Sequence, residues 1–143
     1  AGHWLMAELL GIKVKEVSII TGRTTMEDYI VNISDRTSVS TCVKIFYAGL
    51  IGEQILLGKA GNGCMGGKNA DLERAEDLIK RHILLTDEAE LTPSYISQET
   101  AEKIAAMSKQ IRQEVMSELT ENRSKLEDRY MQLLKKKEIR ITE

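Results

Sequence analysis

Apolar side chains recur every three or four residues through most of this chain, the spacing that places them on one face of an α-helix. The pattern predicts helices over residues 3–10, 38–57 and 69–85, and two long helices, or one bent helix, over residues 97–137. Gly11 suits the left-handed turn that ends the first helix. Asn69 is the expected N-cap of the third helix, with acidic residues in the turns that follow it.

The exception to the helical period lies near the start of the chain. Residues 13–33 are rich in β-branched and aromatic side chains on either side of a turn at 21–23, which predicts a β-hairpin. We therefore expect a fold that is mostly α with a small β-hairpin (α+β), arranged as a helical bundle in one domain over residues 1–143. Its expected parts are an N-terminal helix and hairpin (1–33), a helical core (36–86) and long C-terminal helices (97–137).

The composition is that of a globular domain with an aliphatic core. Apolar residues make up 42% of the chain, aromatic residues only 4%, and the formal net charge is −2. A nearly balanced charge gives no general attraction to nucleic acid, so no such partner is expected. No apolar run approaches the roughly 18–20 residues of a membrane helix, and Cys42 and Cys64 are expected to be reduced thiols. These features favour a cytoplasmic protein, unless segments before Ala1 associate it with a membrane.

The glycine-rich segment 58–69 raises the alternative of nucleotide binding. The phosphate-binding pattern G-x-x-x-x-G-K-[ST] would use Gly67 and Lys68 here, but its first glycine position is Asn62 and its hydroxyl position is Asn69. The segment also follows a predicted helix, whereas a phosphate-binding loop normally follows a strand. A loop that lets the chain turn is the favoured interpretation, and a nucleotide-binding helical domain is the weaker one.

Two short motifs, far apart in this chain, occur together in one protease family. The segment GKNADLERA (67–75) resembles the T-G-A-S-N-D-L-E-R-A-T segment of the FtsH-type ATP-dependent zinc metalloproteases, and AGH (1–3) resembles the end of their H-E-A-G-H motif. Further matches occur in the same order at KEVSII (15–20), AGLIGEQ (48–54), SQET (97–100) and LTENR (119–123). The chain thus resembles the peptidase domain of that family over nearly its whole length.

The resemblance implies a zinc-dependent endopeptidase in which His3 and Asp71 are metal ligands. In an H-E-x-x-H helix, two imidazoles four positions apart share one face and bind one Zn²⁺, while the glutamate between them is the general base. Bound zinc lowers the pKa of its water from roughly 16 to about 7, which makes hydroxide available to attack a peptide carbonyl. Asp71, near the start of a helix, is the implied third protein ligand, and one position stays open for water and substrate.

By this resemblance the catalytic glutamate would stand immediately before Ala1, and the first histidine one position earlier. Three interpretations stay open: a longer protein supplies both residues, the chain is cut at this point, or the protein is a degenerate relative that lacks the motif. In the last case the domain would be a catalytically inactive binding or assembly module, which is the main alternative to the enzyme.

Simpler interpretations exist for each of these residues. A histidine on an amphipathic helix is commonly structural, and an aspartate near a helix start is favoured by the helix dipole alone. His82 follows Lys80 and Arg81 in a predicted helix and is expected to be exposed. Cys64 could reach a metal at Asp71, but an ordinary free thiol is the favoured interpretation.

The resemblance also implies partners. Family members bind unfolded substrate as an added strand, so the predicted strand at 14–20 is a candidate edge, with Val14, Val17 and Ile19 as substrate contacts. A plain structural hairpin is the equal alternative. An AAA+ ATPase module, upstream or on another protein, is implied, as is a homo-oligomer, which in the family is a hexamer.

Overall fold

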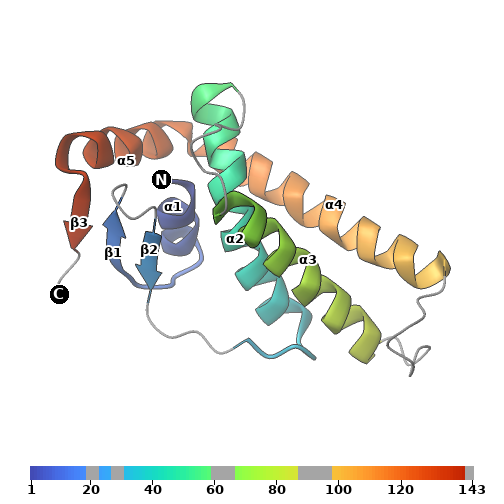
Figure 1. Cartoon of the computed structure of the whole chain (residues 1–143). Helices are drawn as coiled ribbons and strands as arrows, with labels where there is room; N and C mark the ends of the chain where they lie inside the picture. The colour runs from blue at the N-terminus through green and yellow to red at the C-terminus, as the bar shows by residue number, and fades with distance from the viewer. Residues whose placement is uncertain (19–22, 27–30, 59–66, 87–97, 141–143) are drawn as a thin grey trace.

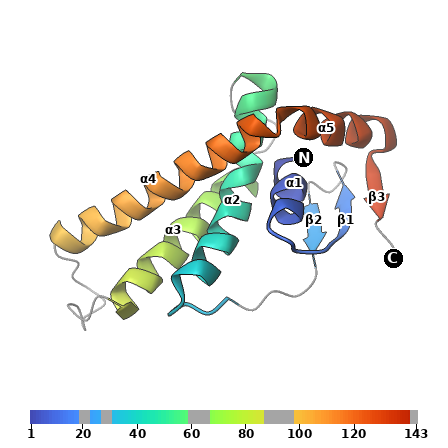
Figure 2. The ribbon, with the colours of Figure 1, turned by 180° about the vertical axis from the view of Figure 1, so that it is seen from behind.

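The computed structural model describes residues 1–18, 23–26, 31–58, 67–86 and 98–140 as a mostly helical protein. Its helices are α1 (Gly2–Leu9), α2 (Arg36–Leu57), α3 (Gly67–Thr86), α4 (Gln98–Glu121) and α5 (Arg123–Lys136). Its strands are β1 (Val14–Ser18), β2 (Arg23–Met26) and β3 (Glu138–Arg140). Figure 1 shows α2, α3 and α4 side by side, and both Figure 1 and Figure 2 place α1 between α2 and the sheet. The predicted helical bundle with a small β element is confirmed at this level.

Helix α2 is the centre of the bundle, since it contacts every other helix. It begins two residues before the predicted start because Asp35 caps it: the Asp35 side chain accepts a hydrogen bond from the Thr37 backbone N–H at 3.1 Å. It ends at Gly58, whose φ of 77° is readily adopted only by glycine. Of the described helices, α2 alone is long and apolar enough to cross a membrane by length and composition, with a mean hydropathy of 1.2. Of that apolar window, 39% is buried, and the buried apolar residues of α2 belong to the protein core.

One buried apolar cluster includes residues from all five described helices and from β1. Aliphatic side chains make up most of it, as the composition predicts, and burying each contributes about 1.5–3 kcal/mol relative to leaving it exposed. The fully or nearly fully buried members are Trp4, Leu5, Met6, Ala7, Ile12, Val14, Val39, Val43, Ile45, Tyr47, Ala48, Ile51, Ala75, Ile79, Ile83, Met107, Ile111, Val115, Leu119, Leu126 and Leu133.

Helix α3 begins at Gly67 and not at the predicted Asn69. Asn69 is therefore inside the helix, and its expected role as N-cap is wrong. The first turn of α3 contains no acidic residue, so Asp71 lies in the second turn. Glycine disfavours helix, so the glycines before Asn69 led to a predicted helix start that is two residues too late.

The three described strands form an antiparallel sheet in the order β2-β1-β3. A hairpin is present within the predicted range as the β1–β2 pair, in which Val14 lies opposite Met26 and Ser18 opposite Arg23. Its second strand differs from the prediction, because β2 begins at Arg23, inside the predicted turn, and residues 31–33 are not part of a strand. Strand β3 pairs with β1 over Glu16–Ser18 and was not predicted. Over Glu16–Ser18, β1 is paired on both sides and is the central strand, so the expected open edge is wrong for these residues.

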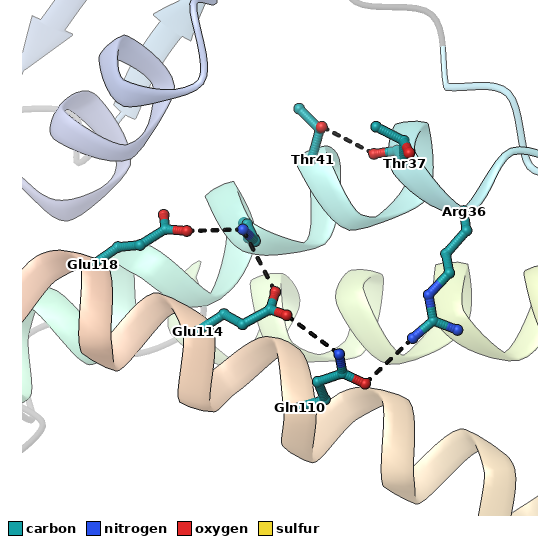
Figure 3. Close-up of polar contacts among 7 residues, drawn as sticks. Arg36, Thr37, Thr41, Gln110, Glu114 and Glu118 are labelled. Atoms are coloured by element: carbon teal, nitrogen blue, oxygen red, sulfur yellow. Dashed lines mark hydrogen bonds and ion pairs between the residues drawn. The ribbon is translucent and has the colours of Figure 1, made fainter.

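A line of polar side chains joins α2 to α4 on the outside of the bundle, as Figure 3 shows. The Lys44 ammonium lies 2.9 Å from Glu118 Oε1 and 3.5 Å from Glu114 Oε2. Gln110 then donates to Glu114, and Arg36 donates to Gln110. Burial by itself would lower the pKa of Lys44, but the hydrogen bonds and negative charges of Glu118 and Glu114 together raise that pKa above its usual 10.5.

Candidate functional site

Helix α1 carries His3 and lies unusually close to α2. A Cβ added at Gly2 would stand only 1.9 Å from the backbone oxygen of Ala48, and one added at Gly52 would stand 3.0 Å from the Gly2 Cα. Only glycines permit such an approach of two helix backbones. Glycine ordinarily weakens a helix, and Gly52 lies in α2 where the α1 backbone packs against it. This close contact fixes where the first turn of α1 lies.

The imidazole of His3 lies against Gly49. A Cβ at this position would stand 2.3 Å from His3 Nε2 and 2.6 Å from Cε1, so a side chain there would occupy the space of the ring. The other ring nitrogen, Nδ1, lies 2.7 Å from the carbonyl oxygen of Ile45. A carbonyl oxygen can only accept, so Nδ1 carries the proton and donates it. The ring is therefore held by α2 in a defined orientation.

Asp71 approaches the remaining nitrogen of this ring from α3. Its Oδ2 lies 3.0 Å from His3 Nε2, and the side chains of His3 and Asp71 are 26% and 25% exposed. The two residues come from the beginning and the middle of the chain, and α2 brings them together because both α1 and α3 pack against it. The predicted convergence of the imidazole and the carboxylate is therefore present.

Two chemical descriptions fit this geometry. In the first, His3 is protonated on both nitrogens and forms a charge-assisted hydrogen bond with Asp71. In the second, Nε2 and Oδ2 are two donors to one cation. Since both ring nitrogens are already engaged, His3 has no free nitrogen with which to act as a general base on a substrate.

The contact to Ile45 is the arrangement expected around a metal-binding histidine. Such histidines commonly donate the second ring N–H to a backbone carbonyl or carboxylate, which fixes the tautomer and turns the other nitrogen toward the metal. Zinc bonds of about 2.0–2.2 Å at a tetrahedral angle separate two donor atoms by about 3.4 Å. The observed 3.0 Å between His3 Nε2 and Asp71 Oδ2 is a few tenths of an ångström short of that separation. Two of the donors of a zinc site thus fit, while no group of three or more His, Cys, Asp or Glu that could hold a metal occurs within the described ranges.

The remaining predicted site residues are not part of this site. Val14 is 6% exposed and belongs to the core, and the backbone of Val17 is paired on both sides with Thr24 and Ile139. Val17 therefore offers no open strand edge to a substrate, and the Val14 side chain is not exposed for contact with one. Ile19 and Cys64 lie outside the described residues.

His82 differs from its expected placement, whereas Cys42 agrees with the expected free thiol. His82 is 6% exposed, and its Nδ1 lies 2.6 Å from the Ile33 carbonyl oxygen, so the prediction of an exposed histidine is wrong. Cys42 is a free, partly buried thiol on α2, and burial raises its pKa, which disfavours a reactive thiolate.

Two contributors to the site were missed at the level of sequence: the Ile45 carbonyl and the space above Gly49. A backbone acceptor leaves no mark in a sequence. Gly49 is visible in the sequence, because a glycine inside an apolar helix indicates a close neighbour. In the structure that neighbour is the His3 ring.

Comparison with known proteins adds no identification. No protein-family model matches this chain, and the search of curated proteins gives no match.

Proposed function

We propose that this chain is a zinc-dependent metalloendopeptidase domain of the FtsH type, which hydrolyses peptide bonds in protein substrates. The observation that carries the proposal is the 3.0 Å approach of His3 Nε2 to Asp71 Oδ2, with His3 Nδ1 held by the Ile45 carbonyl. These are the two residues that the motif resemblance implies as ligands, and they meet although most of the helical core separates them in sequence.

In this proposal His3 and Asp71 hold the zinc ion, and Ile45 and Gly49 hold His3. A bound zinc ion supplies Lewis acidity that activates water for attack on a peptide carbonyl. The resemblance places a second imidazole and the general-base carboxylate on the same helix as His3, at the two positions before Ala1. Position −4 from His3 is one helical turn away on the same face, where its imidazole can reach the same ion.

The partners follow from the same resemblance and rest on it alone. Unfolded or peptide segments are the proposed substrates, delivered by an AAA+ ATPase module upstream or on another protein. A cytoplasmic location and assembly into a homo-oligomer, a hexamer by resemblance, are proposed with them.

The experiment uses the chain extended at its amino end by one helical turn that ends in His-Glu. We expect this protein to bind about one zinc ion per chain and to cleave an unfolded test protein such as casein, with both properties lost in Asp71→Asn. Asp77→Asn is the matched control, because Asp77 lies on the same helix but forms an exposed ion pair with Arg81. An extended protein that neither binds zinc nor differs from its Asp71→Asn variant would contradict the proposal.

A catalytically inactive binding or assembly module is the second candidate, and one observation favours it. His3 and Asp71 satisfy each other, and the pair alone can serve to fasten α1 to α3. For such a module, Asp71→Asn lowers stability in both the original and the extended protein, and zinc changes neither.

A further inference from the structure

Helix α1 is too short to hold His3 in place by itself. It spans Gly2–Leu9, and isolated helices of this length are not stable in water. The orientation of His3 therefore depends on what α1 packs against. One side is the contact with α2 described above; another is α5, which follows in the chain more than a hundred residues later.

A single guanidinium forms much of the polar contact between α1 and α5. The Arg129 Cζ lies 4.9 Å from the centre of the Trp4 ring, and Nη2 lies 2.7 Å from Glu8 Oε2. Nη1 lies 3.2 Å from Asp128 Oδ2 on its own helix, which orients the group. Trp4 directly follows His3, and Glu8 stands one turn after Trp4 on the same face of α1. Arg129 thus holds α1 at two points of one face.

The unsatisfied hydrogen-bond donors of this contact indicate that it orients α1 and is not there mainly to add stability. Trp4 Nε1 and Arg129 Nε are both buried, and neither has a hydrogen-bond partner among the described residues. A buried N–H without an acceptor is unfavourable, so an apolar pair would serve stability better at this position. What the pair provides is a flat cation over the face of a flat ring, a contact that favours one arrangement of the two helices.

We propose that Arg129 is a positioning residue that sets the rotation of α1 about its own axis and thereby points His3 at Asp71. Successive residues on a helix are about 100° apart, so Trp4 held on one face determines the direction of His3. A rotation of about 20° moves an atom ~6 Å from the helix axis by about 2 Å. That displacement exceeds the tolerance of the 2.7 Å contact to Ile45 and the 3.0 Å contact to Asp71. That Arg129 orients a metal ligand rests on the proposed function. The orientation of His3 itself can be tested in the metal-free chain.

The test uses the two histidines of the chain, which form equivalent contacts in different places. Both His3 and His82 donate Nδ1–H to a backbone carbonyl, at 2.7 Å and 2.6 Å. In metal-free protein, NMR should show one hydrogen-bonded Nδ1–H proton from each histidine, assigned with His3→Gln and His82→Gln. In Arg129→Met we expect the His3 signal to broaden or disappear and the His82 signal, on α3, to remain.

Arg123→Met is the matched control, since Arg123 lies on the same helix but pairs only with Glu127 in the part of the chain that the structure describes. It should leave both signals unchanged, and Arg129→Lys, which restores the positive charge but not the flat guanidinium, should recover the His3 signal only in part. If Arg129→Met does not fold, Glu8→Gln removes one half of the contact at a more exposed position and should weaken the His3 signal alone. A folded Arg129 or Glu8 variant in which the His3 and His82 signals both persist, or change equally, would overturn the inference.

The zinc affinity of the extended protein distinguishes a failure of this inference from a failure of the proposed function. In the extended protein we expect Arg129→Met to weaken zinc affinity about 10- to 100-fold, the usual effect of losing a residue that orients a ligand. The same substitution should have no further effect in a His3→Gln background. Failure of the unsubstituted extended protein to bind zinc counts against the function alone; equal binding with and without Arg129 counts against the positioning role.

Discussion

Asp71 Oδ2 lies 3.0 Å from Nε2 of His3, and the opposite nitrogen of the same ring is anchored to α2. The pair joins the first helix of the chain to the third. Because the anchor fixes the ring orientation without Asp71, the carboxylate meets a nitrogen whose direction is already set. This preorganisation distinguishes the pair from an ordinary surface ion pair, in which both side chains are free to move.

The first prediction concerns Gly49. Alanine at this position would place a Cβ 2.3 Å from His3 Nε2, so the ring must leave its position. Helix propensity alone would make Gly49→Ala more stable by up to about 1 kcal/mol. We expect instead no gain in the free energy of unfolding, together with loss of the hydrogen-bonded His3 ring proton, measured by chemical denaturation and by NMR. A variant that gains stability and keeps that proton would show that the ring does not need the space above Gly49.

The second prediction separates the roles of the two histidines. His82 is buried and bonded to the Ile33 carbonyl, so His82→Leu leaves a backbone acceptor without its donor and should lower the free energy of unfolding by about 1–3 kcal/mol. His3→Gln, at a more exposed position, should cost less stability but abolish zinc binding by the extended protein. Equal effects of both substitutions on both properties would mean that His3 has no special role.

The third prediction concerns Lys44 and pH. Its pKa is raised in the folded protein, so the stability that its pairing contributes is fully present below the ordinary pKa of 10.5 and is lost as pH rises through the higher folded value. Lys44→Met should therefore lower the free energy of unfolding by about 1–2 kcal/mol at neutral pH. The difference from the unsubstituted protein should shrink above pH 10.5.

Denaturant unfolding at pH 7, 9 and 11 checks this prediction, with the exposed Lys109 on α4 as the control for loss of a lysine charge. Lys109→Met should change stability little at any of these pH values. A Lys44→Met effect that grows with pH would contradict the assigned direction of the pKa shift.

The sequence was informative where periodic apolar positions carry the structure. The helices follow from spacing alone, and the start of α3 was missed because glycines surround it. His82 shows a subtler limit: its charged neighbours Lys80 and Arg81 suggested exposure, but it lies three positions after Ile79 and seven after Ala75, which form the buried face. Position on the helix outweighs the polarity of adjacent residues.

Long-range pairing was beyond what the sequence could show. Strand β3 has three residues, and its partner β1 lies at the other end of the chain. No local pattern marks so short a strand, and without it β1 resembles an open edge. The meeting of His3 and Asp71 was expected only through the motif resemblance, since spacing alone cannot bring residues from α1 and α3 together.

The central claim is that His3 and Asp71 bind one metal ion, and diffraction from crystals of the extended protein at the zinc absorption edge tests it most directly. The account predicts one strong anomalous peak within about 2.0–2.2 Å of both His3 Nε2 and Asp71 Oδ2, with the two side chains no longer in direct contact. The absence of a peak at this position in zinc-soaked crystals, with Nε2 and Oδ2 still hydrogen-bonded to each other, would contradict it.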